Sequence, residues 1–184
     1  MVFYYNSLHG DAPELLSHQL SQFISPEILG SRQIVILCIG SDRSTGDSLG
    51  PLIGYKLSKH TLNNVSIHGT LSSPVHAANL EYTIELINEQ YDNPYIIAID
   101  ASLGKKDHIG CVTLGTGALK PGLGVKKRLP EVGNIHITGI VDFSGMMDTV
   151  LLQTTRLCTI MTLADVISKA IIDTFKYTSA LEAS

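Results

Sequence analysis

Two short apolar runs constrain the fold of this chain more than any other feature. The run IVILCIG covers residues 34–40 and the run YIIAIDA covers residues 95–101, and neither alternates between apolar and polar residues. Continuous apolar runs of this length are typical of strands buried on both faces, as in a parallel sheet that helices cover. They therefore predict a central sheet with helices on both sides of it.

Segments with helical periodicity alternate with the strand-like runs. Asp11, with Pro13 and Glu14 behind it, has the pattern of a helix start, and Pro26 limits how far that helix can extend. Further helices are predicted over about 48–60, 77–91 and 155–177, and further strands over 65–70, 108–115 and 134–142. This alternation predicts βαβ units in a three-layer α/β/α fold with a twisted, mainly parallel sheet, formed by one domain of residues 1–184.

The composition excludes several classes of protein. Hydrophobic residues make up 44% of the chain and charged residues 16%, which is typical of a globular domain. No apolar run reaches the roughly 18 residues of a membrane span, and the first residues lack the pattern of a signal peptide. The formal charge of −4 argues against a nucleic-acid surface. The expected location is the cytoplasm, with neither a membrane nor a nucleic acid as partner.

The three cysteines do not predict a metal or disulfide framework. Cys38, Cys111 and Cys158 are far apart in sequence, and no two of them form a C-x-x-C pair. Each is surrounded by apolar residues, so the sequence predicts reduced thiols buried in the core.

The sequence predicts a functional centre at a pair of aspartates. In open α/β sheets, ligands bind beyond the carboxyl ends of the strands, at the crevice where the strand order reverses. If the first three predicted strands lie in the spatial order 2-1-3, this crevice separates the loop after residues 34–40 from the loop after residues 95–101. Asp47 and Asp100 come from these two segments. The two carboxylates are therefore expected to meet at one point.

Converging acids have three chemical uses, and the residues leave all three open. They can share a proton and activate water, hold a divalent metal, or bind a cationic group of a ligand. No metal or other cofactor is expected, and a metal would need Asp47 and Asp100 together with His76 or His136. More commonly, histidines in such positions are hydrogen-bonded structural residues. Asp47 alone could also be no more than a helix cap.

Other motifs point less clearly to function. The glycines at 40, 46 and 50 lack the Gly-Lys-Ser/Thr ending of a phosphate loop and the G-x-G-x-x-G spacing of a dinucleotide site. Ser73 and Ser144 have no G-x-S-x-G surroundings, so a serine hydrolase is not indicated. The basic residues at 126–128 lie in a stretch rich in Gly and Pro, which predicts either a solvated loop or a contact to an anion or a peptide backbone.

Three segments resemble the spore germination protease family. The run GSDRSTGDSLGP at 40–51 resembles that family's loop ending in Thr-Pro-Asp-Ala-Leu-Gly-Pro, and IAIDA at 97–101 resembles its second acidic strand end. The stretch KPGLGV at 120–125, followed by Lys127 and Arg128, resembles its Pro-Gly-Ser-Gly-Val-Gly-Asn-Lys-Arg segment. A closer resemblance, over nearly the whole chain, is to the YyaC family of sporulation proteins. A more distant one is to the hydrogenase maturation endopeptidases.

These resemblances imply a fold, a site and a role. The fold is the phosphorylase/hydrolase-like, HybD-like α/β/α fold, and the site aspartates are Asp47 and Asp100. The corresponding substrate-binding residues are Thr45, Gly46, Gly122, Gly124 and Lys127. The implied role is in spore formation or germination, inside the forespore or spore core, with a protein or peptide as substrate and a homo-oligomer left open.

The chain also departs from the family patterns. Gly46 replaces the Pro that precedes the acid, and Lys126 stands where the germination protease has Gly-Asn. The third metal ligand of the maturation enzymes, a late His, has no clear counterpart. Three functions are therefore compatible with the sequence: a peptidase whose paired aspartates activate water, a non-catalytic peptide-binding or assembly protein of the spore, and a metal-binding maturation endopeptidase.

Overall fold

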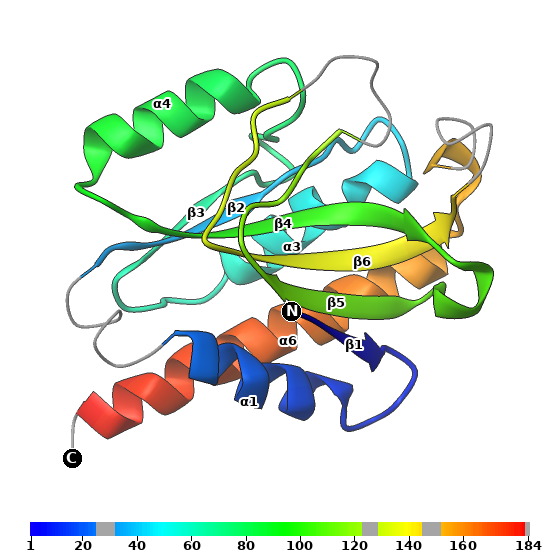
Figure 1. Cartoon of the computed structure of the whole chain (residues 1–184), viewed down its shortest axis with the longest axis horizontal. Coiled ribbons are helices and arrows are strands. Elements are labelled where there is room, and N and C mark those ends of the chain that lie inside the picture. The colour runs from blue at the N-terminus through cyan, green and yellow to red at the C-terminus, as the bar shows by residue number, and fades with distance from the viewer. Residues whose placement is uncertain (25–31, 123–128, 145–151, 183–184) are drawn as a thin grey trace.

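A six-stranded sheet in the order β1-β5-β6-β4-β2-β3 forms the centre of the protein (Figure 1). The structure is a computed structural model that describes residues 1–24, 32–122, 129–144 and 152–182, with the backbone only for 177–182. The strands are β1 (Val2–Asn6), β2 (Ile34–Cys38), β3 (Val65–His68), β4 (Tyr95–Gly104), β5 (Cys111–Thr116) and β6 (Ile135–Phe143). Strands β3, β2, β4 and β6 are parallel to one another, whereas β5 is antiparallel to both β6 and β1.

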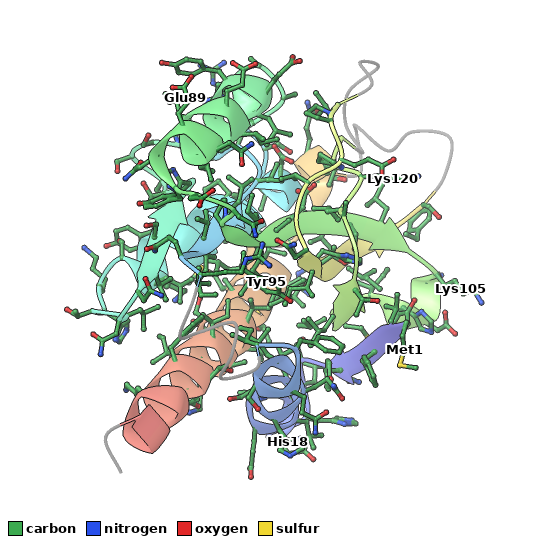
Figure 2. The ribbon with its side chains drawn as sticks, turned by 60° about the vertical axis from the view of Figure 1, so that its left-hand side comes forward. Met1, His18, Glu89, Tyr95, Lys105 and Lys120 are labelled. Carbon is green, nitrogen blue, oxygen red and sulfur yellow. The ribbon has the colours of Figure 1, made fainter. Side chains whose placement is uncertain are left out.

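Helices cover both faces of this sheet, so the predicted three-layer α/β/α fold is confirmed. The helices are α1 (Ala12–Phe23), α3 (Leu49–Leu57), α4 (Leu80–Gln90) and α6 (Leu157–Glu182), with the short 3-10 helices η1 (Gly46–Ser48) and η2 (Lys106–His108). Helix α4 lies on one side of the sheet, and α1 lies with α6 on the other (Figure 1). In a second view, Glu89 of α4 and His18 of α1 mark these opposite sides (Figure 2). Within the described residues, no helix combines the length and hydropathy needed to cross a membrane.

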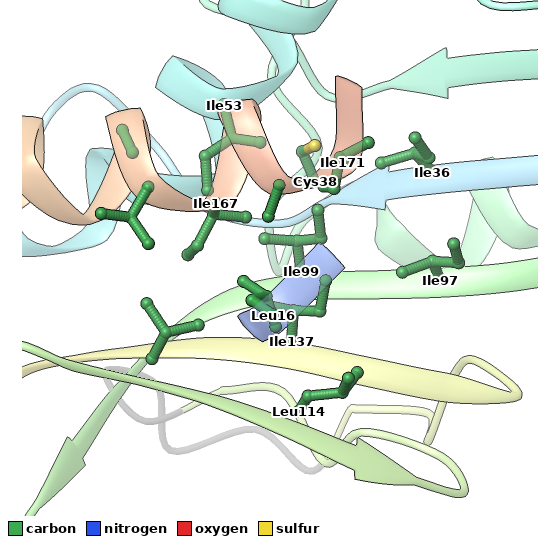
Figure 3. Packing of buried hydrophobic residues seen from close by; sticks show 14 of the residues in the cluster. Leu16, Ile36, Cys38, Ile53, Ile97, Ile99, Leu114, Ile137, Ile167 and Ile171 are labelled. Atoms are coloured by element: carbon green, nitrogen blue, oxygen red, sulfur yellow. The ribbon is translucent and has the colours of Figure 1, made fainter. Parts of the chain in front are cut away.

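Two apolar clusters, one on each face, hold the layers together. In the larger cluster, strand residues meet side chains of α1, α3 and α6; they include Ile36, Ile97, Ile99, Leu114, Ile137, Leu16, Ile53, Ile167 and Ile171 (Figure 3). In the smaller cluster, Val35, Leu37 and Ala98 pack with Leu80 and Ile87 of α4. The absence of polar alternation in the central strands follows from this burial on both faces.

The smallest test of this core is the loss of one methyl group. Ile97→Val is expected to lower the free energy of unfolding by about 1 kcal/mol, because Ile97 is fully buried in β4. Ile109→Val removes the same group from a side chain that is 37% exposed and should have little effect. Urea unfolding of both variants measures the difference, and equal losses would contradict the assignment of Ile97 to the core.

Helix α3 approaches the sheet closely because glycines face the strand ends. A Cβ atom on Gly50 would overlap the carbonyl oxygen of Ile39, and one on Gly54 would overlap that of Gly69. A Cβ on Gly69 would in turn overlap the carbonyl oxygen of Cys38. The glycine at 50 therefore serves packing rather than a phosphate loop, and this packing fixes where α3 begins.

The sheet departs from the prediction at one edge. Strand β1, which pairs with β5 from Val2 to Asn6, is absent from the elements predicted above. The central order is as expected, because β2 lies between β3 and β4, which is the predicted order 2-1-3. The order of the parallel strands therefore reverses between β2 and β4, and we call the place between the loops that follow these two strands the crevice.

The cysteines are only partly as predicted. Cys38 is buried, as expected for a core thiol, whereas Cys111 is half-buried and Cys158 is exposed; all three are free. Apolar neighbours in sequence do not decide which side of a helix a residue occupies, and Cys158 lies in the first turn of α6 on its solvent side.

Candidate active site

The loop after β2 folds back on the strand end and brings Asp47 to the crevice. The N–H of Ile39 donates to the carbonyl of Ile99 (2.7 Å), which joins the end of β2 to β4. The N–H of Ser41 donates to the main-chain carbonyl of Asp47 (3.0 Å), so the loop closes on itself. Gly40 has a φ of 138° and would place a Cβ against that same carbonyl. Glycine at position 40 therefore allows Asp47 to lie directly beside the strand end.

Asp47 belongs to η1, immediately before α3. Ser48 immediately precedes α3, but its hydroxyl does not cap the helix; it donates to the carbonyl of Thr45 (2.7 Å). The carboxyl of Asp47 is half-buried, and it accepts the N–H of Ser41, which lies outside the helix. A capping role therefore does not account for this carboxylate.

The strand that carries Asp100 is longer than predicted. It does not end beside Asp100 but continues to Gly104, paired throughout with β6. The neighbouring strand β2 ends first, at Cys38 opposite Ile99, so Asp100 has no strand partner on that side. The carboxyl is only 6% exposed, and its Oδ1 accepts the N–H of Ala101 (2.8 Å).

The two aspartates differ in how far their surroundings raise the pKa of each carboxyl. Burial raises the pKa of Asp100 well above its usual range, the negative charge of Asp47 raises this pKa further, and the Ala101 N–H opposes both effects. Burial also raises the pKa of Asp47, but the N–H of Ser41 and the charge of His76 oppose it. Two carboxyl groups that interact in this way lose their protons in separate steps. Asp47 ionises first, and Asp100 keeps the remaining proton.

Asp100→Asn is expected to stabilise the fold at neutral pH. A raised pKa means that folding favours the neutral carboxyl. The free energy of unfolding of the wild type therefore falls as the pH rises above the unfolded value of about 3.9 towards the raised folded value. An amide carries no charge and avoids this loss, so thermal unfolding measured upward from about pH 4 should show an advantage of the variant that grows as the pH rises towards the raised pKa of Asp100.

The matched control for this titration is Asp42→Asn, because Asp42 is exposed in the same loop as Asp47. This variant makes the same Asp-to-Asn exchange without removing a buried carboxyl. A stability difference for Asp100→Asn that is constant, or that shrinks as the pH rises, would contradict a raised pKa for the buried carboxyl.

Of the two candidate histidines, His76 is the one whose charge acts on Asp47. His76 directly follows Val75, which forms an isolated β-bridge with Ile39 at the end of β2. The charge of His76 lowers the pKa of Asp47. His136 lies on β6 opposite Ala98, and its Nδ1 bonds to the carbonyl of Gly117 (3.0 Å). Within the parts of the chain that the structure describes, no three His, Cys, Asp or Glu side chains are grouped so that they could hold a metal ion.

The residues predicted to bind substrate are spread over several environments. Thr45 is half-buried beside η1, and Gly46 is buried, with the backbone of Leu152 so close that a Cβ would come within 2.7 Å of its carbonyl oxygen. Packing against Leu152 alone is enough to require a glycine at position 46. Gly122 has a φ of 111° and lies at the end of a described segment. Gly124 and Lys127 lie outside the described residues, as do Lys126 and Arg128.

A group of hydroxyls beside Asp100 was not predicted. Thr138 lies opposite Asp100 in the register of β4 and β6, and its Oγ1 is 2.7 Å from that of Thr113 and 2.9 Å from Oγ of Ser102. We call Ser102, Thr113 and Thr138 the hydroxyl row. It lines a cavity of about 400 Å³ together with, among others, Tyr4, Lys105 and His108. Its sequence signal is the polar residue at alternate positions of otherwise apolar strands, which places a polar strip on one sheet face.

Comparison with known proteins places the chain among uncharacterised relatives. A family model described as "Protein of unknown function (DUF1256)" matches residues 5–170. The "Uncharacterized protein YyaC" of Bacillus subtilis (strain 168) is 46% identical over 163 residues, which covers 89% of this chain and 80% of the relative.

A solved structure shares the fold. The NiFe hydrogenase maturation protease HycI from Thermococcus kodakarensis KOD1 superimposes with a TM-score of 0.55, covering 86% of this chain and 99% of that one, at 16% sequence identity. A likeness at this identity concerns the arrangement of the sheet and helices. It supports the HybD-like fold implied by the sequence.

Proposed function

Because the chain belongs to the DUF1256 family of proteins of unknown function, its activity has to be inferred from its own site, and we propose that it is a peptidase in which Asp47 and Asp100 activate water. The observation that carries this proposal is the electrostatic division of the pair. One carboxyl is buried and holds a proton, and the other is half-buried and ionises first. Pairs whose environments separate their pKa values in this way are typical of general acid–base sites.

The proposed reaction uses Asp47 as the base. Its carboxylate takes a proton from water while the water oxygen bonds to the peptide carbonyl carbon, and the carbonyl π electrons move to oxygen. In the second step this electron pair returns, the C–N bond breaks, and the amine nitrogen takes the proton from Asp47. Asp100 stays protonated throughout, so no second negative charge lies beside the developing oxyanion. The carboxylate of Asp47 is regenerated.

The substrate is proposed to be an extended protein segment. The hydroxyl row lies on β4, β5 and β6 next to Asp100 and lines the cavity described above, so an extended chain laid there can pair its backbone N–H and C=O groups with hydroxyls. The cavity of about 400 Å³ has room for a substrate side chain. The motifs shared with the germination protease family support a spore protein as the substrate, cleaved inside the forespore or spore core.

The test is direct. Purified protein is incubated with small acid-soluble spore proteins over a wide pH range, beside the double variant Asp47→Asn/Asp100→Asn, and new peptide termini are identified by mass spectrometry. We expect cleavage by the wild type and none by the double variant. Elemental analysis of both preparations tests the maturation-endopeptidase alternative, which requires stoichiometric Ni, Zn or Mn that the double variant loses. Absence of cleavage at every pH would contradict the proposed peptidase function.

A non-catalytic role is the second candidate, and the altered residues around the site favour it. Gly46 stands where the germination protease family has Pro, and Lys126 where it has Gly-Asn. In this case the protein would bind peptides or support assembly in the spore without hydrolysis. A double aspartate variant that still supports normal spore formation, in cells lacking the wild-type protein, would favour binding over catalysis.

A further inference from the structure

His76 is held beside the aspartate pair by its own loop. The N–H of Gly40 donates to the carbonyl of Val75 (2.8 Å), which ties the residue before His76 to the strand end that also contacts Asp47. The side chain of Asn79 fixes the backbone on both sides of this point: its Oδ1 accepts the N–H of His76 (2.8 Å), and its Nδ2 donates to the carbonyl of Pro74 (3.1 Å). The position of His76 is therefore set by two neighbouring segments of the crevice.

The tautomer of His76 follows from its contacts. The N–H of Ala78 donates to Nδ1 of His76 (3.3 Å), so Nδ1 is an acceptor and the neutral ring carries its proton on Nε2. The two ring nitrogens point in different directions, and Nε2–H is therefore directed away from the turn that Nδ1 contacts. No described residue accepts a hydrogen bond from this Nε2–H. The ring is half-buried and lies close enough to Asp47 for its charge to act there.

His136 shows the opposite arrangement. Its Nδ1 faces the carbonyl of Gly117 (3.0 Å), and a carbonyl can only accept, so the neutral ring carries its proton on Nδ1. The two neutral rings therefore carry their proton on different nitrogens, that of His76 on Nε2 and that of His136 on Nδ1. The contrast shows that the local backbone selects which nitrogen of each histidine is available as a donor.

We propose that His76 is a catalytic residue whose Nε2–H stabilises the oxyanion that forms on the scissile carbonyl. This inference rests on the peptidase function proposed above and adds a residue to it. Asp100 is only 6% exposed and is poorly placed to touch substrate, whereas half-buried Asp47 is needed as the base. A fixed donor in a partly dry crevice stabilises charge that appears only in the transition state. The donor is present in both the neutral and the protonated ring.

The kinetic test compares three variants on the spore-protein substrate. His76→Ala should lower kcat by about 10²–10³ with little change in KM, because the lost interaction exists only in the transition state. His76→Gln keeps a side-chain N–H donor and should recover part of the rate. His136→Ala is the matched control and should leave kcat close to that of the wild type. A purely structural role for His76 would instead lower Tm, give no split between kcat and KM, and show no rescue by Gln.

The second arm does not need activity. Long-range ¹H–¹⁵N correlation spectra of the full chain, at a pH where the rings are neutral, report which nitrogen carries the proton. We expect the proton of His76 on Nε2 and that of His136 on Nδ1, with the Ala variants assigning the signals. A proton on Nδ1 of His76, or an unchanged kcat for His76→Ala in an active enzyme, would overturn this inference alone. A wild type that cleaves nothing would instead overturn the peptidase function, and the role of His76 with it.

Discussion

Asp47→Asn is expected to lower kcat for peptide hydrolysis by about 10²–10⁴, the range associated with the loss of a general base. The amide cannot accept a proton from water, yet it has nearly the same shape and can accept the same N–H from Ser41. The loop that closes through the Ser41 and Asp47 backbones is unchanged by this substitution. The effect should therefore appear in kcat rather than in the thermal stability of the protein.

The pH dependence separates the two aspartates. The active form has Asp47 ionised and Asp100 protonated, so the rate should rise as the pH passes the raised pKa of Asp47 and fall again as Asp100 ionises. Asp100→Asn leaves a neutral group in place and should remove the fall at high pH that the wild type shows. Steady-state rates of wild type, Asp47→Asn and Asp100→Asn across the pH range measure this. Wild-type activity in Asp47→Asn at any pH would contradict its role as base.

The largest expected effect on stability comes from Gly50→Ala. The added Cβ would overlap the carbonyl oxygen of Ile39, which is backbone and cannot rotate away. Overpacking a tight site costs about 1–3 kcal/mol and sometimes more, and an overlap with backbone belongs to the upper end, so we expect a loss of about 3 kcal/mol or more. Helix α3 would have to move, and Asp47 at its start would move with it. Activity should therefore fall together with stability.

Gly10→Ala provides the control for this substitution. A Cβ on Gly10 would meet no atom within 4 Å, so the variant should unfold within about 0.5 kcal/mol of the wild type. Urea unfolding at one pH compares the two variants. A stable Gly50→Ala protein would show that α3 can separate from the strand end at little cost, and would remove the packing explanation for this glycine.

The centre of the sheet was predictable because its signal is local. Strand β2 and residues 95–101 of β4 are buried on both faces, so the apolar residues in these segments follow one another without polar alternation. Asp47 and Asp100 could be paired from sequence under the assumed order 2-1-3, because in that order the β2–β3 and β3–β4 crossovers run in opposite directions and leave the ends of β2 and β4 side by side. The continuation of β4 beyond Asp100 was not predicted, because the partner that makes it possible, β6, lies more than thirty residues along the chain.

Three further features could not be predicted, because the residues that form them show no clear local pattern. Strand β1 has only Phe3 and Tyr5 half-buried, and its pattern of alternate exposure is too short to tell from a disordered start. The hydroxyl row depends on the register of three strands, and a shift of one residue would send each side chain to the opposite face. The donor nitrogen of His76 depends on an N–H two residues later, which requires the backbone geometry itself.

The pairing of β1 with β5 also affects how the chain reaches its native state during synthesis. Val2 pairs with Gly115, so more than a hundred further residues must be synthesised before β5 is available to pair with β1. At about 5–20 residues per second this takes on the order of 5–20 s, during which the Val2–Asn6 segment has no sheet to join. The parallel strands β2, β3 and β4 are complete earlier and can associate first. The edge of the sheet that borders the cavity is thus expected to close last, on a centre that already holds both aspartates.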